Sequence, residues 1–349
     1  MSNPNYKPYL DGFRGISILI VAISHGGFGH IVPGGFGLTV FFFISGYLIT
    51  SLLLKEKDSR GFIGLPDFYM RRLWRLIPAL VVYIAVSLML ALALHEKQGL
   101  AEPASALFYY SNYYKLFIGY DRVGGSYSPY DVLWSLAVEE HFYLFFAPLV
   151  AFIRNRKTLL KTILFLLVAP LLIRALATHF MPPALSAEYA YRATDARIDS
   201  IAYGCLLAVL GQQSFLKLKS RAVFALGVAL ILLSLLIRDE YFRQVIRYTM
   251  QGVGLYLIFS EVIYADTMGW ARKCLSGKFI VFIGKLSYSM YLYHWLGLIL
   301  MVLFVGAIDL GPRWQAAYWA VTMALSALSY YVVERPTLKL RVKYGSNAE

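Results

Sequence analysis

An imidazole and two adjacent carboxylates lie inside long apolar segments of the sequence, where ionisable side chains are rare and usually serve a function. His25 lies near the predicted outer end of the first segment. Glu139 and Glu140 lie roughly 12 Å below the outer end of the fourth segment. A histidine and a carboxylate at matching depth are the components of a general base and the group that orients it. We predict that His25, Glu139 and Glu140 are catalytic. Adjacent helical residues point about 100° apart, so only one glutamate, Glu139, is expected to face the imidazole.

Arg14 lies at the start of the same apolar segment as His25, eleven residues earlier. Eleven residues of α-helix make three turns plus about 20°, so the two side chains would share one face, roughly 16 Å apart. Asp11 lies three residues before Arg14, close enough on a helix to pair with it. This arrangement predicts an arginine at the inner mouth of a channel and an imidazole in its outer half. Two plainer interpretations stay open: Arg14 could snorkel at the membrane edge, and His25 could be a packing residue.

A second basic cluster, Arg71, Arg72 and Arg75, stands just before the third apolar segment, with Pro78 near the expected helix start. Arg71 and Arg75 are four residues apart and so share a helix face. Cations at a helix N-terminus oppose its dipole. The cluster is therefore better explained if it holds an anion together with free backbone amides. The alternative is that the arginines are ordinary anchors beside lipid headgroups.

These side chains must be positioned by helices that cross a membrane. Of 349 residues, 59% are apolar and 15% charged, whereas soluble domains are about 45–50% apolar and about 25% charged. The apolar residues form long runs, and about 20 of them suffice to cross the hydrocarbon core. We predict an all-α polytopic membrane protein of about ten transmembrane helices. Their predicted ranges are 14–32, 36–54, 76–94, 131–153, 159–178, 197–212, 221–237, 247–265, 286–306 and 314–333.

The net charge of +13 follows the predicted topology and does not indicate a nucleic-acid site. With the N-terminus inside, 23 lysines and arginines fall in inner segments and nine in outer segments. An excess of positive charge in inner loops is typical of membrane proteins. We therefore predict that both termini are cytoplasmic, that the protein contacts membrane lipid, and that it has no nucleic-acid partner.

The sequence predicts one integral membrane domain over residues 1–349, with no appended soluble domain. Its two cysteines, Cys205 and Cys274, are not expected to pair, since one lies in a predicted span and the other in an inner loop. No cleavable signal peptide is evident, because the first apolar run contains His25 and several glycines. We predict no metal site and no permanently bound cofactor.

Short sequence strings along the chain, each weak alone, gain specificity from their order and spacing. They are Asp11 to Gly15 with His25, Gly37 to Leu48, Phe68 to Pro78, Trp134 to Tyr143, Arg197 to Gly204, Ser287 to His294, and Glu334 to Pro336. Together they resemble the acyltransferase-3 family of integral membrane acyltransferases, over nearly the whole chain. The resemblance implies transfer of an acetyl or other short acyl group from cytoplasmic coenzyme A. The acceptor would be a hydroxyl of an extracytoplasmic glycan, such as lipopolysaccharide O-antigen, capsule or another surface polysaccharide.

The resemblance also implies a location in the bacterial cytoplasmic (inner) membrane and acetyl-CoA as co-substrate. Some family members carry a further esterase-like domain, which we do not expect here. We predict that the acyl-CoA is bound by Asp11, Arg14, Arg71, Arg72 and Arg75. His25 would either act as general base on the sugar hydroxyl or carry the acyl group covalently.

Residues near the outer ends of the fourth and sixth segments are candidates for binding the acceptor. They are Ser135, Tyr143, Arg197 and Asp199. Arg197 and Asp199 could instead pair with each other or with a loop. For Ser45 we favour a hydrogen bond to its own helix backbone, and for His294 a bond between helices.

Two other functions fit the same polar residues. A proton-coupled transporter of an anionic metabolite or lipid-linked sugar would use His25 and the glutamates as a proton relay. It would consume no thioester. A non-catalytic scaffold of glycan assembly would tolerate replacement of His25 and Glu139.

Overall fold

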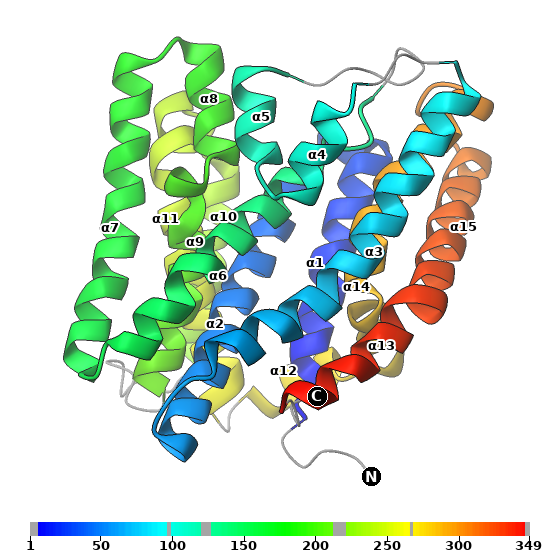
Figure 1. The fold of residues 1–349 in the computed structure, drawn as a ribbon. Helices are drawn as coiled ribbons and strands as arrows, with labels where there is room; N and C mark the ends of the chain where they lie inside the picture. Colours follow the sequence, from blue (N-terminus) through cyan, green and yellow to red (C-terminus); the bar gives the residue numbers. More distant parts are fainter. Residues whose placement is uncertain (1–5, 96–98, 120–126, 212–220, 266–267, 346–349) are drawn as a thin grey trace. The chain divides into compact units, whose positions relative to one another are not determined.

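The computed structural model describes residues 6–95, 99–119, 127–211, 221–265 and 268–345 (Figure 1). Within these ranges the chain is almost wholly helical and contains no strand. The predicted all-α class is therefore confirmed for the described part of the chain.

The chain folds into two compact units that are interleaved in sequence. Unit 1 is made of Met1–Gly37, Gly64–Trp134 and Lys278–Glu349, and unit 2 is made of Leu38–Ile63 and Ser135–Gly277. Neither unit is a segment appended to the other, because the chain enters unit 2 twice and returns to unit 1 each time. The predicted single domain over residues 1–349 stays a prediction.

Unit 1 holds the first and the last helices, and α14 forms its centre. Its elements are α1 (Pro8–Ile23), the π-helical turn η1 (Ser24–Phe28), α3 (Leu65–Ala93), α4 (Ala101–Leu107), α5 (Ser111–Phe117), α13 (Lys278–Lys285), α14 (Ser287–Phe304), α15 (Pro312–Ser329), the π-helical turn η5 (Tyr330–Glu334), α16 (Arg335–Leu338) and the 3-10 helix η6 (Lys339–Tyr344). α1 packs against α13 and α14, and α14 packs against α15. Every residue from Ser287 to Ile299 is buried, so the polar groups of α14 must be satisfied by the protein.

Unit 2 holds the middle of the chain. Its elements are α2 (Gly34–Arg60) from residue 38 onward, α6 (Trp134–Phe152) from residue 135 onward, α7 (Arg156–Phe180), α8 (Pro183–Arg192), α9 (Thr194–Leu210), α10 (Arg221–Leu236), the π-helical turn η3 (Phe242–Ile246), α11 (Arg247–Tyr264) and α12 (Gly269–Leu275). α7 and α11 both pack against α9, and α10 packs against α11 (Figure 1).

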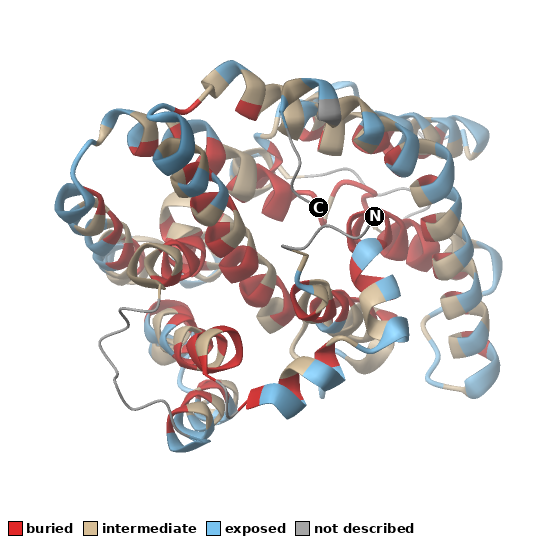
Figure 2. Ribbon diagram, turned by 90° about the horizontal axis from the view of Figure 1, so that it is seen from below, coloured by how far each residue is buried: buried red, intermediate tan, exposed pale blue. Residues whose placement is uncertain are grey.

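Each of the ten predicted spans overlaps one of these helices. Among the described residues, six helical segments are long and apolar enough to cross a membrane: α2, α3, α6, α7, α14 and Pro312–Arg341. Many helices are buried along one side and exposed along another (Figure 2). On α7 the exposed side carries large apolar residues, such as Phe165, Leu172 and Leu176, as expected of a surface that faces lipid. The number of ten spans and the cytoplasmic location of both termini stay predictions.

Two helices begin well before the residue that the apolar pattern predicts. α1 begins at Pro8 instead of residue 14, and α3 begins at Leu65 instead of residue 76. Each has a proline in its first turn, where the missing N–H costs nothing and the fixed φ suits a helix. Each also has an aspartate there, Asp11 or Asp67, which favours the helix dipole. A proline and an aspartate in the first turn favour a helix that extends beyond its apolar run, and hydropathy alone does not reveal this.

Unit 2 is held together by a close crossing of α2 and α9 at two glycines. A Cβ at Gly46 would fall on the carbonyl oxygen of Ile201, and a Cβ at Gly204 would fall on that of Phe43. The obstacle is backbone in both cases, so it cannot move aside. Small residues are typical where membrane helices approach this closely.

We expect Gly46→Ala to push α2 from α9 and to lower the thermal unfolding temperature of the detergent-solubilised protein. Gly269→Ala is the matched control, because a Cβ at Gly269 meets nothing within 4 Å. Fluorescence-detected thermal unfolding of both variants would measure the effect. Equal unfolding temperatures for the two variants would contradict the close crossing.

Candidate functional site

His25 lies on the π-helical turn η1, directly after α1. π-helical turns are rare and often occur at functional sites. Gly27, two residues on, has φ +111°, a backbone conformation that glycine adopts without strain. The widened turn changes the register assumed for a straight α-helix. The shared face of Arg14 and His25 therefore stays a prediction.

The partner of His25 in unit 1 is His294 on α14. His25 Nδ1 lies 2.9 Å from His294 Nε2, and the rings are stacked with centroids 5.1 Å apart. His294 Nδ1 in turn lies 3.1 Å from the Met290 carbonyl oxygen. His294 is fully buried, and Trp295 meets the His25 ring edge-on at 4.9 Å. The predicted hydrogen bond of His294 between helical segments is confirmed.

α14 also holds the segment that leads into α6. Trp295 Nε1 donates to the Ser128 carbonyl oxygen at 2.8 Å, and Tyr291 Oη donates to that of Val132. From α3, Tyr83 Oη donates to the Pro129 carbonyl at 2.6 Å. The imidazole pair therefore lies beside a segment whose backbone is fixed by three buried donors.

The basic residues predicted to bind acyl-CoA also lie in unit 1. Arg14 Nη1 lies 3.9 Å from Asp11 Oδ1, so the predicted pairing is confirmed. Arg71, Arg72 and Arg75 lie within α3, which begins six residues before Arg71. The prediction that they stand at a helix N-terminus beside free amides is therefore wrong. The cause is the early start of α3 described above.

Glu334 is a carboxylate beside the arginines predicted to bind acyl-CoA, and the sequence alone did not predict a role for it there. It is buried at the end of η5, and Ser289 Oγ donates to its Oε2 at 2.7 Å. Both Arg75 and Arg14 interact electrostatically with it. Two of the predicted donor-binding arginines are thus brought to one buried carboxylate. Sequence spacing holds no signal for this, because Glu334 is distant from both in the chain.

Glu139 lies in unit 2, on α6. Ser45 Oγ on α2 donates to Glu139 Oε1 at 3.1 Å, and Tyr143 Oη donates to Oε2 at 3.3 Å. The expectation that Ser45 bonds its own helix backbone is wrong, because this carboxylate is its acceptor. His141 points elsewhere and lies 2.7 Å from Thr194 Oγ1. Glu139 belongs to unit 2 and His25 to unit 1, and their pairing stays a prediction.

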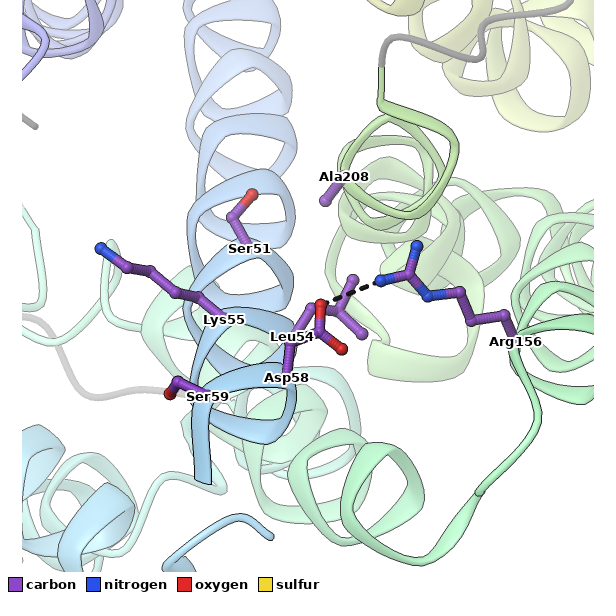
Figure 3. A pocket seen from close by; sticks show the side chains of 7 residues that line it. All are labelled: Ser51, Leu54, Lys55, Asp58, Ser59, Arg156 and Ala208. Atoms are coloured by element: carbon purple, nitrogen blue, oxygen red, sulfur yellow. Dashed lines mark hydrogen bonds and ion pairs between the residues drawn. The ribbon is translucent and has the colours of Figure 1, made fainter. Parts of the chain in front are cut away.

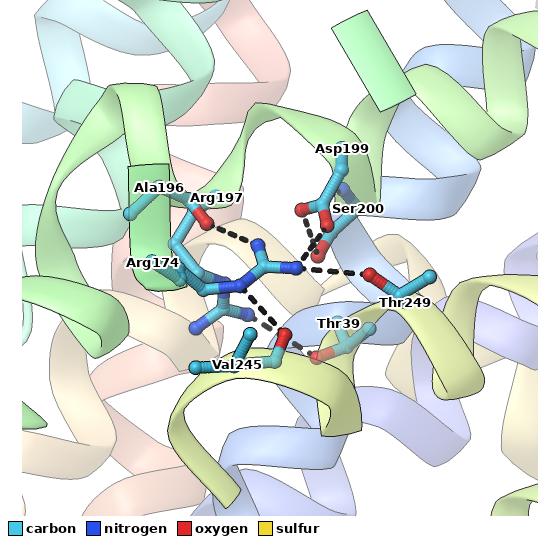
Figure 4. A network of polar contacts seen from close by, with 8 residues as sticks. All are labelled: Thr39, Arg174, Ala196, Arg197, Asp199, Ser200, Val245 and Thr249. Atoms are coloured by element: carbon cyan, nitrogen blue, oxygen red, sulfur yellow. Dashed lines mark hydrogen bonds and ion pairs between the residues drawn. The ribbon is translucent and has the colours of Figure 1, made fainter. Parts of the chain in front are cut away.

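Arg197 and Asp199 lie in a buried polar network in unit 2 (Figure 4). Arg174 Nη2 forms an ion pair with Asp199 Oδ2 at 2.8 Å, and both side chains are fully buried. Arg197, also fully buried, donates to the Tyr191 carbonyl oxygen at 2.9 Å and to Thr39 Oγ1 at 3.2 Å. Asp199 thus pairs with Arg174, and a backbone carbonyl in the last turn of α8 is one acceptor of Arg197. Acceptor binding by these two residues stays a prediction, as it does for the other two candidates, Ser135 and Tyr143.

A surface hollow in unit 2 contains none of the predicted site residues (Figure 3). Its volume is about 520 Å³, and it is crossed by an exposed ion pair of 2.9 Å between Arg156 and Asp58. The lining residues are Ser51, Leu54, Lys55, Asp58, Ser59, Arg156 and Ala208. No group of three His, Cys, Asp or Glu that could hold a metal ion occurs in the described ranges.

The described residues are almost wholly helical, and six of their helical segments are long and apolar enough to cross a membrane, which is typical of an integral membrane protein. The acyltransferase domain model of the acyltransferase-3 family matches residues 7–332, and the chain belongs to this family. The predicted resemblance is thereby confirmed.

Two relatives carry functional names. Peptidoglycan O-acetyltransferase OatA of Listeria monocytogenes is 30% identical over 96% of this chain and 56% of its own length. O-acetyltransferase OatA of Staphylococcus aureus is 30% identical over 97% of this chain and 58% of its own length. The chain therefore spans little more than half the length of these relatives. No solved structure matches it significantly.

We expect Asp199→Asn to destabilise unit 2 strongly, because it leaves the buried Arg174 guanidinium without a counter-charge. Breaking a buried ion pair in this way costs about 3–5 kcal/mol. Asp58→Asn is the matched control, since it breaks a pair of similar length between side chains that are 62–66% exposed. Such a pair contributes at most about 1 kcal/mol.

Thermal unfolding of both variants in detergent measures the difference. An Asp199→Asn protein with unchanged stability and a raised KM for the acceptor would contradict the structural role and support acceptor binding.

Proposed function

We propose that this protein is a membrane O-acyltransferase that moves an acetyl group from cytoplasmic acetyl-CoA to a hydroxyl of an extracytoplasmic glycan. The observation that carries the proposal is the match of the acyltransferase domain over residues 7–332. The names of the two relatives support acetyl as the group and oxygen as the acceptor atom. The glycan is a bacterial surface polysaccharide, with O-antigen, capsule and peptidoglycan as the candidates. The protein acts in the cytoplasmic (inner) membrane.

The chemistry requires a base beside the thioester. His25 takes the proton of the sugar hydroxyl, and the resulting oxygen nucleophile attacks the thioester carbonyl. The new ester C–O bond forms, the C–S bond breaks, and the histidine returns the proton to the leaving thiolate as free coenzyme A. In the covalent variant His25 attacks the thioester first and then passes the acetyl group to the sugar. Half-buried His25 is accessible enough for either route.

The donor is held through its phosphates. Arg14, Arg71, Arg72 and Arg75 all belong to unit 1, the unit that contains His25. Guanidinium groups bind phosphate through paired, charge-assisted hydrogen bonds. Asp11 and Glu334 are the carboxylates that hold arginines of this region in place. One compact unit thus carries both the proposed donor contacts and the proposed base.

We expect His25→Ala to lower thiol release from acetyl-CoA by about 10²–10⁴-fold, the usual contribution of a general base. The assay uses purified protein in detergent with a crude surface-glycan extract as acceptor. His30→Ala is the control, because His30 is exposed. Size-exclusion chromatography checks that both variants are folded.

Thiol release that persists in folded His25→Ala protein would overturn the role of His25. Absence of release from the wild type, across several acyl donors and glycans, would overturn the acyltransferase itself. Proteoliposome uptake assays would then test the transporter.

We expect Arg75→Gln to raise the KM for acetyl-CoA about tenfold or more, because one charge-assisted hydrogen bond contributes about 1.5–3 kcal/mol. Acetyl-pantetheine lacks the phosphates, so the same substitution should leave its KM unchanged. Arg221→Gln, at an exposed arginine of unit 2, is the control. An equal effect of Arg75→Gln on both donors would exclude phosphate binding by this arginine.

A further inference from the structure

The hydrogen bonds of the two histidines form a chain that ends at a group able only to accept. Met290 presents a carbonyl oxygen to His294 Nδ1 at 3.1 Å. His294 Nε2 faces His25 Nδ1 at 2.9 Å. A neutral imidazole has one N–H donor and one acceptor nitrogen. The direction of the chain is therefore determined by its last member.

The protons follow from this direction. The carbonyl accepts, so Nδ1 of His294 carries the hydrogen and its Nε2 is the acceptor. His25 must then donate from Nδ1, which leaves the lone pair of its ring on Nε2. A cationic His294 would reverse this order, but a charged imidazole that is fully buried is costly. The neutral form of His294 is thus the one that the site favours.

We propose that His294 is a positioning residue that holds His25 in the tautomer with Nδ1 protonated, so that Nε2 is the nitrogen that reacts. The inference rests on the proposed acyl transfer. The His294 imidazole acts here as the aspartate does in a serine-protease triad, where the aspartate selects the tautomer and orientation of the histidine base. Within unit 1, His294 thus orients His25, and the orienting role predicted for Glu139 stays a prediction.

Ring packing fixes the orientation as well as the proton. The His25 and His294 rings are nearly parallel, with 12° between their planes, and the Trp295 ring meets His25 at 68°. The indole is itself anchored, because its Nε1 donates to Ser128. A rotation of the His25 ring about its Cβ–Cγ bond would break the hydrogen bond to His294 and the ring contacts with His294 and Trp295. The packing of the three rings therefore fixes the direction in which Nε2 points.

The proton balance follows the same chain. The sugar hydroxyl gives its proton to Nε2, and His25 becomes an imidazolium. Its Nδ1–H bond to His294 then becomes charge-assisted and stronger. When Nε2 passes the proton to the leaving thiolate, the pair returns to its neutral state. The partner therefore stabilises the transient positive charge on His25 through this hydrogen bond.

Two substitutions of similar size separate this role from packing. His294→Gln keeps a carbonyl oxygen near the position of Nε2, where it can accept from His25. His294→Met has almost the same length and volume but lacks that acceptor. We expect kcat to stay within about tenfold of wild type in the Gln variant and to fall about 10²–10⁴-fold in the Met variant. The KM for acetyl-CoA should be unchanged in both, because His294 does not bind the donor.

The tautomer is read directly by nitrogen NMR of protein labelled with ¹⁵N-histidine. The chain has six histidines, and a His25→Gln sample assigns the resonances of His25. We expect a protonated Nδ1 and an unprotonated Nε2 in the wild type and in His294→Gln. In His294→Met the two nitrogens should show averaged shifts of mixed tautomers.

Wild-type spectra with an unprotonated Nδ1 would overturn the inference, even if both variants fail to fold. Equal kcat values for folded Gln and Met variants would overturn it too. A wild type that releases no thiol from any donor would refute the acyl transfer, and the spectra would still decide the tautomer.

Discussion

A buried polar side chain that is shielded from water is stabilised when it finds a hydrogen-bond partner in the protein itself. This constraint accounts for the hydrogen bonds of α14. Tyr291 and Trp295 donate to loop carbonyls, and Ser289 donates to Glu334. Each bond satisfies a buried donor and also fixes a segment that the apolar contacts alone would leave free to shift. The polar residues of the helices thus determine how the segments between them are placed.

The same constraint explains how unit 2 tolerates two fully buried guanidinium groups beside one carboxylate. Asp199 neutralises Arg174. Arg197 lies over the Tyr248 ring, 4.0 Å from its centroid, with Phe42 and Tyr191 also within 6 Å. Aromatic faces carry partial negative charge and attract cations most strongly where water is excluded. The three rings therefore provide part of the electrostatic stabilisation that a second carboxylate would give to the Arg197 guanidinium.

Each predicted span overlaps a helix, because a long apolar run marks it, whereas short helices such as α4, α8 and α12 were not predicted. The sequence also predicted the pairing of Asp11 with Arg14, which depends only on helical spacing. It failed for the starts of α1 and α3, where a proline and an aspartate extend the helix beyond its apolar residues. It also missed His294 as the partner of His25, since the two are 269 residues apart and only the tertiary fold brings them together. Local sequence patterns predict individual helices, whereas a contact between residues on different helices can be seen only in the folded structure.

Accessibility separates the buried groups that hold the structure from those that can react. Arg174 uses Nε, Nη1 and Nη2 on Val245, Ala196, Thr249 and Asp199 and is fully buried. A substrate could reach it only by displacing those partners, at the cost of leaving them unsatisfied. His25 differs because it is half-buried, and its described hydrogen bond to a fully buried imidazole engages Nδ1. A half-buried group whose orientation is fixed by a buried partner can exchange a proton without loss of the fold. This combination is what a base within a membrane requires.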